Sequence, residues 1–76
     1  MNKSRRGALQ DVIEALEAAR DELESLKSEE EEYAENMPEN MQSSETHDTA
    51  EDAVNSMEDA ISNIDDAISN IESAIG

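Results

Sequence analysis

The chain has 76 residues, with no cysteine and one histidine, and its 21 acidic residues against 5 Lys and Arg residues give a net charge of −16. This length allows one domain with a thin core, and without disulfides, zinc–thiolate sites or a histidine-based metal cluster the usual remaining source of stability is oligomerisation. The charge repels nucleic acid and anionic membranes and attracts basic surfaces.

The first predicted helix runs from about residue 5 to 35. Apolar residues recur every seven positions, as in a coiled coil whose positions are lettered a to g. Position a holds Leu9, Leu16 and Leu23, and position d holds Val12, Ala19, Leu26 and Tyr33. We expect Ser4 to cap the helix, and Met37-Pro38 to prevent its continuation, because the residue before a proline disfavours the α conformation.

A connection of about 12 residues, 36 to 47, contains Asn, Pro and Ser residues that favour turns, and it has room for one helical turn beginning at Pro38. Connections of this length are often functional. Tyr33 and Met37 are expected to pack beneath it or, with Met41, to form an apolar patch ringed by acidic residues. The candidate partner-binding residues here are Glu35, Met37, Glu39 and Met41.

The second predicted helix, about 48 to 75, consists of four aligned rows: AEDAVNS, MEDAISN, IDDAISN and IESAIG. Position a holds Val54, Ile61, Ile68 and Ile75; position d holds Ala50, Met57, Ile64 and Ile71; position g holds Ala53, Ala60, Ala67 and Ala74. Positions e and f are mostly acidic. Asp48 and Glu51 have the spacing of a capping box, Ser44 is an alternative cap for an earlier start, and Gly76 follows the last helical residue.

Charges at position e predict that the two helices form one antiparallel hairpin, because e faces e in such a pair. Position e of the first helix carries Arg20 and Lys27, and the expected partners are Asp65 for Arg20 and Glu58 for Lys27. Exposed pairs of this kind are worth only about 0.2–1 kcal/mol each, so they select orientation and register more than they stabilise.

The apolar strips are too wide for two helices to cover one another. The sequence therefore predicts an all-α domain, residues 1–76, whose antiparallel two-helix hairpin forms a homodimer with the architecture of a four-helix bundle. Repulsion between two chains of net charge −16 would oppose this dimer, so salt should strengthen it. The alternative is that the uncovered strip binds a different protein.

The residue types give no support for catalysis or for a bound cofactor. His47 has acidic neighbours but no visible pocket or rigid polar partner, so we interpret it as a loop or capping histidine. The acidic run 29–35, EEEEYAE, points its carboxylates in different directions and lacks a calcium-loop pattern, so we interpret it as a solvated helix end. We expect no enzyme, no cofactor and no metal site.

Carboxylates at position f of the second helix suggest that the chain binds a basic protein surface. Glu58 and Asp65 are expected to be occupied by Lys27 and Arg20. The remaining candidate partner-binding residues are Asp52, Asp59 and Asp66. Such rows can imitate nucleic-acid phosphates, although one helix carries charge too sparsely to imitate a DNA duplex. The alternative is a structural or adaptor protein whose acidity serves solubility alone.

The segments MNKSRRGAL and EEEEYAENMPENMQSSE and the closing acidic heptads resemble a group of small acidic helical proteins of Gram-positive bacteria and their phages. The likeness implies a mobile-element origin and an inhibitor of host DNA-processing or defence proteins, and it implies no catalytic residue. Because the chain also lacks an apolar segment of about 18 residues and a signal-peptide pattern, we expect a soluble cytoplasmic protein.

Overall fold

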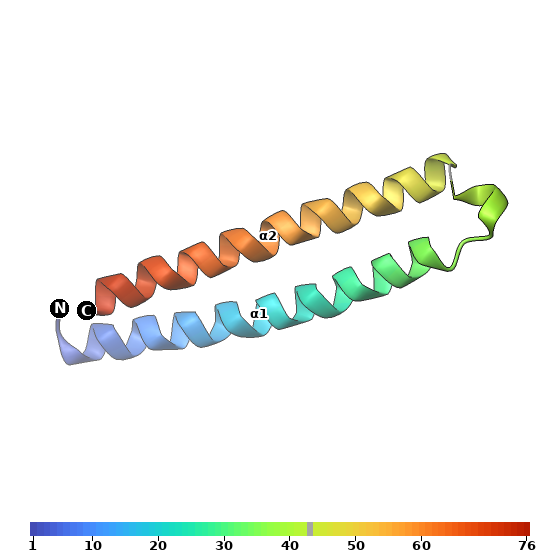
Figure 1. Ribbon diagram of the computed structural model, residues 1–76. Coiled ribbons are helices and arrows are strands. Elements are labelled where there is room, and N and C mark those ends of the chain that lie inside the picture. The colour runs from blue at the N-terminus through green and yellow to red at the C-terminus, as the bar shows by residue number, and fades with distance from the viewer. Residues whose placement is uncertain (43) are drawn as a thin grey trace.

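A computed structural model of the protein describes residues 1–42 and 44–76. It contains the helices α1 (Lys3–Glu35) and α2 (Glu45–Ile75), with one 3₁₀ turn, η1 (Glu39–Met41), between them. The two long helices lie side by side and antiparallel, so that both termini are at the same end of a rod measuring 60 × 15 × 12 Å (Figure 1). The predicted all-α antiparallel hairpin is therefore confirmed.

Helix α1 begins two residues earlier than the sequence analysis predicts. The Asn2 side chain, not that of Ser4, caps it: Asn2 Oδ1 accepts a hydrogen bond of 2.7 Å from the Arg5 backbone N–H. Asparagine is as good a cap as serine, and its position gives the helix one more half-turn. The end at Glu35 agrees with the prediction, and the Asn36 N–H donates to the Glu32 carbonyl at 2.9 Å.

The connection is tied to itself and to the end of α1 by hydrogen bonds. Pro38 directly precedes η1, as its fixed φ angle allows, and its carbonyl accepts from the Met41 N–H at 2.8 Å. Gln42 Nε2 donates to the Met37 carbonyl at 2.8 Å. Met37 itself is only 9% exposed, so this side chain packs into the turn.

Helix α2 begins at Glu45, three residues before the predicted start. Its cap is Ser44, whose Oγ accepts from the His47 backbone N–H at 3.2 Å, and Asp48 lies inside the first turn. The capping hydrogen bond is thus accepted by Ser44 instead of Asp48, the alternative cap, and the helix starts at the earlier residue. As a result His47 is helical and occupies position a, seven residues before Val54. The helix ends at Ile75 and is capped by Gly76, where φ is +97° and the N–H donates to the Glu72 carbonyl.

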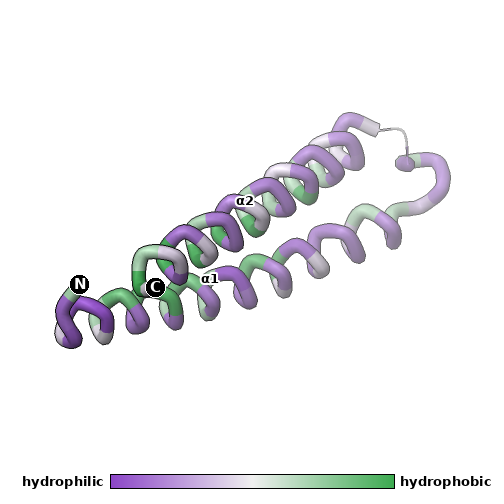
Figure 2. Tube along the Cα trace, turned by 60° about the vertical axis from the view of Figure 1, so that its left-hand side comes forward, coloured by the Kyte–Doolittle hydropathy of each residue, from purple (hydrophilic) through white to green (hydrophobic). Residues whose placement is uncertain are grey.

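Residues at positions a and d of α2 pack in the seam between the helices, but only position a of α1 does so as predicted. Within the described residues the buried apolar side chains are Ile13, Ala34, Met37, Ala50, Ile61 and Ile68. The hydrophobic segments of α2 lie on the side of that helix facing α1 (Figure 2). Ile13 and Ala34 belong to position e of α1, and they are 4% and 5% exposed.

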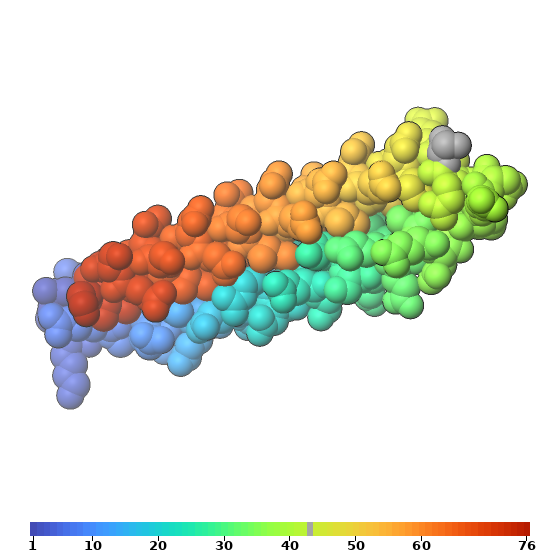
Figure 3. Space-filling model, viewed as in Figure 1, coloured from blue at the N-terminus to red at the C-terminus, as the bar shows by residue number. Residues whose placement is uncertain are grey.

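Position d of α1 lies outside the seam, contrary to the expectation that it packs against α2. Val12, Leu26 and Tyr33 are 45%, 47% and 52% exposed. The helix is rotated about its axis so that position e faces α2, because Ile13 and Ala34 are apolar and Arg20 and Lys27 must reach acidic partners there. The side chains of the two helices still form a continuous rod (Figure 3).

Both predicted ion pairs across the hairpin are present. Arg20 Nη1 lies 3.0 Å from Asp65 Oδ1, and Lys27 Nζ lies 3.3 Å from Glu58 Oε1. The hydrogen bond to Asp65 raises the pKa of the Arg20 guanidinium, and that to Glu58 raises the pKa of the Lys27 ammonium group, against the opposing effect of desolvation. The register of the hairpin is therefore the one that the charges predict.

Candidate functional site

The candidate partner-binding residues fall into two groups on the structure. Glu35, Met37, Glu39 and Met41 cluster at the turn, and Asp52, Asp59 and Asp66 form a row along α2. All of them are exposed except Met37, which is buried in the turn. The structure thus brings the members of each group together but separates the turn from most of the row along the length of α2.

The aspartate row differs from the carboxylates next to it. Glu58 and Asp65 at position e are paired with Lys27 and Arg20. Among residues 1–42 and 44–76, the row Asp52, Asp59 and Asp66 makes no ion pair and no side-chain hydrogen bond. Its members are seven residues apart, or about 10.5 Å along the axis, on one face of a rigid helix. They are therefore available to a cationic partner.

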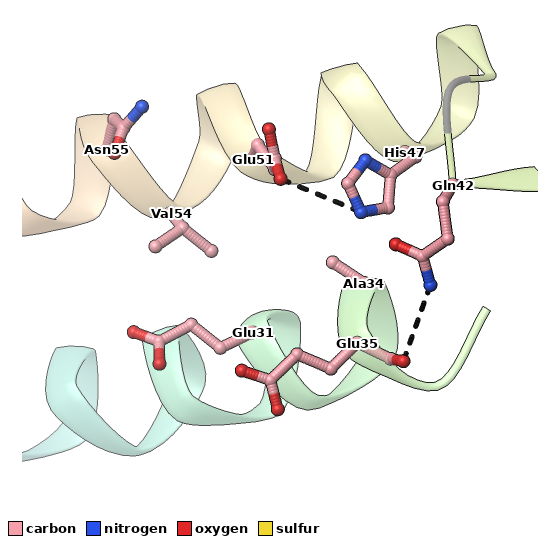
Figure 4. Close-up of a pocket in the computed structure, with 8 residues that line it drawn as sticks. All are labelled: Glu31, Ala34, Glu35, Gln42, His47, Glu51, Val54 and Asn55. Atoms are coloured by element: carbon pink, nitrogen blue, oxygen red, sulfur yellow. Dashed lines mark hydrogen bonds and ion pairs between the residues drawn. The ribbon is translucent and has the colours of Figure 1, made fainter. Parts of the chain in front are cut away.

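A cavity of about 390 Å³ opens between the helices near the turn. It is lined by Glu31, Ala34, Glu35, Gln42, His47, Glu51, Val54 and Asn55 (Figure 4). His47 and Glu51 come from α2, Glu31 and Glu35 come from α1, and Gln42 closes the end by donating a long 3.5 Å hydrogen bond to the Glu35 carbonyl. The lining thus combines three carboxylates with the one imidazole of the chain.

The register of the ion pairs explains why this cavity exists. Each step of seven residues along α1 corresponds to seven residues back along α2, so the step after Lys27 and Glu58 brings Ala34 opposite Glu51. Ala34 has neither a positive charge nor the length to fill the gap. The side chain facing Glu51 comes instead from its own helix: His47 Nε2 lies 3.6 Å from Glu51 Oε1.

His47 is buried without a hydrogen bond for its ring. The residue is 8% exposed, and Nδ1 is buried with no hydrogen-bond partner among the described residues. Nε2 is too far from Glu51 for a hydrogen bond. Leaving a buried polar group unsatisfied costs about 1–3 kcal/mol, so a ligand that binds this ring would supply an interaction that the described residues do not make.

Sequence reasoning missed this site because it placed His47 in the connection. The available signal was the heptad itself, since His47 stands seven residues before Val54 and so continues position a of α2. In addition, one ligand atom from each of His47, Asp48 and Glu51 lies within 4.8 Å of the others. From the sequence, His47 and its acidic neighbours were weighed for catalysis, and metal binding was weighed only for clusters of several histidines and for the acidic run 29–35.

The edge of the hairpin opposite the ion pairs of Arg20 and Lys27 is apolar and exposed. We call it the apolar edge; it comprises Val12, Ala19, Leu26 and Tyr33 of α1 and Ala53, Ala60, Ala67 and Ala74 of α2. Tyr33 lines one hollow with Ala50 and Ala53, and another with Met37 and Met41, which places position d of α1 beside position g of α2. Half-exposed large side chains next to small ones form a surface suited to another helix.

No family model, curated protein or solved structure matches this chain. The resemblance to small acidic proteins of Gram-positive bacteria and their phages therefore stays an expectation. Neither described helix is long and apolar enough to cross a membrane.

Proposed function

We propose that this chain is a non-enzymatic acidic binding protein that presents the aspartate row of α2 to a basic groove on a protein target. The observation that carries the proposal is the difference between neighbouring carboxylates: Glu58 and Asp65 are paired, whereas Asp52, Asp59 and Asp66 are exposed and unpaired within the described chain. The target class that fits is a nucleic-acid-handling protein of the host, which the chain would inhibit as a mobile-element product.

The spacing of the row supports mimicry of a single strand better than of a duplex. One carboxylate every 10.5 Å or so corresponds to about every third phosphate of a strand, whose charges are about 3.4 Å apart along the axis. Duplex DNA, with one charge per about 1.7 Å, is much denser. Glu35 and Glu39 provide further exposed carboxylates at the turn.

The experiment is capture of bacterial proteins on the immobilised chain at low salt, followed by elution with a single-stranded oligonucleotide. Proteins that bind through a strand-binding groove should elute with the oligonucleotide and with salt. The triple variant Asp52→Asn, Asp59→Asn and Asp66→Asn should lose this capture. The matched control, Asp11→Asn with Glu14→Gln and Glu24→Gln, changes the net charge equally on exposed positions of α1 and should retain it.

Capture that persists in high salt and in the triple variant would show that the aspartate row is not the binding surface. If capture is lost equally in the triple variant and in its control, the binding depends on net charge and not on the aspartate row. Either result would favour the second candidate, a structural or adaptor protein that assembles through apolar residues. The apolar edge, with Val12, Leu26 and Tyr33 about half exposed, is the observation that favours it.

Both candidates share an assembly, which we propose to be a homodimer of hairpins packed through the apolar edge into a four-helix bundle. A second copy offers the same complementary surface, large side chains of α1 facing the alanines of α2, as a two-fold interface requires. Sedimentation equilibrium in moderate salt should show a species of twice 8.4 kDa. A single species of 8.4 kDa at tens of micromolar would contradict the dimer.

A further inference from the structure

We propose that His47, Asp48 and Glu51, in the first two turns of α2, bind a divalent transition-metal ion of the zinc type. One ligand atom from each of these residues lies within 4.8 Å of the others. His47 and Glu51 also line the cavity between the helices (Figure 4). The inference is independent of the proposed target binding, which involves the aspartate row and does not need His47.

The distance between the imidazole and the carboxylate fits a shared ion. His47 Nε2 and Glu51 Oε1 are 3.6 Å apart, which is too long for a hydrogen bond. Two ligands that each lie about 2.1 Å from a tetrahedrally coordinated ion are about 3.4 Å apart. Because residues four apart lie on the same face of a helix, the backbone of α2 holds the two groups at this separation.

The buried imidazole provides the second, independent observation. His47 is 8% exposed, Nδ1 has no hydrogen-bond partner in the described chain, and the ring forms part of the cavity wall. A plain cluster of surface carboxylates has no such group. Nε2, the ring nitrogen that faces Glu51, also makes no hydrogen bond within the described chain, so an ion held between Nε2 and Glu51 Oε1 would give this nitrogen a partner.

The cavity has the room and the charge that a metal site needs. Its volume of about 390 Å³ leaves space for the ion and for water ligands. Glu31 and Glu35 of α1 form the opposite wall, so their carboxylates balance the charge of the ion and stand within the same cavity. The N-terminal end of α2 carries partial positive charge that opposes a cation, but Asp48 and Glu51 add two negative charges at that end.

The ligand set selects the class of ion. An imidazole nitrogen with carboxylates suits Zn²⁺, Co²⁺ or Ni²⁺, whereas Ca²⁺ and Mg²⁺ prefer oxygen ligands alone. The ion would also continue the series of charged contacts across the hairpin. Arg20 faces Asp65 and Lys27 faces Glu58, and the metal would supply the positive charge at Glu51, opposite Ala34.

The test is titration of the full chain with Zn²⁺ and with Co²⁺, followed by calorimetry, the visible absorption of Co²⁺ and the NMR signals of the His47 ring. We expect one ion per chain, a shift of the imidazole signals and a rise in Tm, because an ion that binds only the folded state stabilises it. Ca²⁺ at the same concentration should leave the imidazole signals unchanged.

Three variants separate this site from general attraction to an acidic surface. His47→Leu places an apolar residue at position a, so it should fold while losing Zn²⁺ affinity by at least roughly tenfold, since even outer-shell changes cost about 10–100-fold. Glu51→Gln should also weaken binding. Asp52→Asn, the matched control on the next residue, removes the same charge from outside the cluster and should bind as the parent does.

Equal Zn²⁺ affinity in His47→Leu and the parent would overturn the proposal, as would imidazole signals that do not respond to Zn²⁺. Equal weakening by Glu51→Gln and Asp52→Asn would also contradict it, because that result assigns the binding to overall charge. None of these outcomes depends on capture of a protein target, so the metal site and the proposed function can fail separately.

Discussion

The two edges of the hairpin are built differently. We call the edge that contains the ion pairs of Arg20 and Lys27 the charged edge. There both cations are paired with carboxylates of the same chain, at N···O distances of 3.0 and 3.3 Å across the helices. At the apolar edge Val12, Leu26 and Tyr33 remain about half exposed. One edge is therefore complete within a single chain, and the other has apolar surface without a matching cover.

The two edges differ in how much their residues contribute to the stability of the fold. Charged pairs at the surface contribute little free energy, and at the charged edge they join Arg20 to Asp65 and Lys27 to Glu58. Apolar surface contributes most of the stability of a fold in proportion to the area removed from water. A rod of two helices can bury only part of that surface, and the apolar edge is what remains.

The largest effect is expected in the seam between the edges. Ile61→Ala removes three carbons from a side chain that is 9% exposed, and it should lower the free energy of unfolding by about 2–5 kcal/mol. Urea unfolding followed by circular dichroism measures this change. A loss below about 1 kcal/mol would mean that position a of α2 is not a packed core.

Leu26→Glu is the next change and acts on the apolar edge. Leu26 is 47% exposed in one hairpin, so the helices should persist, but a carboxylate placed in the proposed dimer interface should weaken the dimer by roughly tenfold or more, equivalent to about 1.4 kcal/mol. Sedimentation velocity across a concentration series measures the shift. The control is Ser25→Glu, which adds the same charge at an exposed neighbouring position and should leave the dimer intact.

Ser44→Ala tests how the end of the charged edge is positioned. Ser44 Oγ accepts the His47 N–H at 3.2 Å, so its loss should cost about 1 kcal/mol and fray the first turn of α2. Hydrogen exchange of the His47 and Asp48 amides should accelerate. In Ser62→Ala, an exposed position in the middle of α2, stability should not fall, and a similar loss in both variants would argue against the cap.

A smaller effect is expected from reversing one pair of the charged edge. Lys27→Glu places a carboxylate opposite Glu58 and next to Glu31, which should lower Tm, and adding Glu58→Lys should restore part of the loss. A double-mutant cycle on thermal unfolding isolates the coupling between the two residues. If the second change gives no recovery, the pair does not form in solution.

The smallest effect is the alkaline pH dependence of the same pair. Glu58 raises the pKa of Lys27 in the folded protein, so the charged lysine stabilises the fold fully below its unfolded pKa, and this contribution is lost as pH rises through the folded value. Tm measured from neutral pH to about pH 11, near the ordinary lysine pKa, should fall less steeply in Lys27→Gln than in the parent. Parallel curves would show that Lys27 does not contribute.

Much of the fold follows from local features of the sequence. The seven-residue period predicts two helices, Met37-Pro38 predicts where α1 ends, and Arg20 and Lys27 predict the register, because spacing along a helix determines which face a side chain occupies. The start of α2 was less predictable, since Ser44 and Asp48 both resemble caps. The cavity at His47 depended on that choice and could not be anticipated without it.

The sequence by itself determined the two helices, their antiparallel order and the pairs Arg20–Asp65 and Lys27–Glu58. Only the tertiary structure decided the rotation of α1, which buries Ile13 and Ala34 and leaves Leu26 outside, and the burial of His47 beside Glu51. The reason is physical. Periodicity and charge are properties of one helix at a time, whereas the rotation and the cavity depend on how side chains of different volume fit against those of the facing helix.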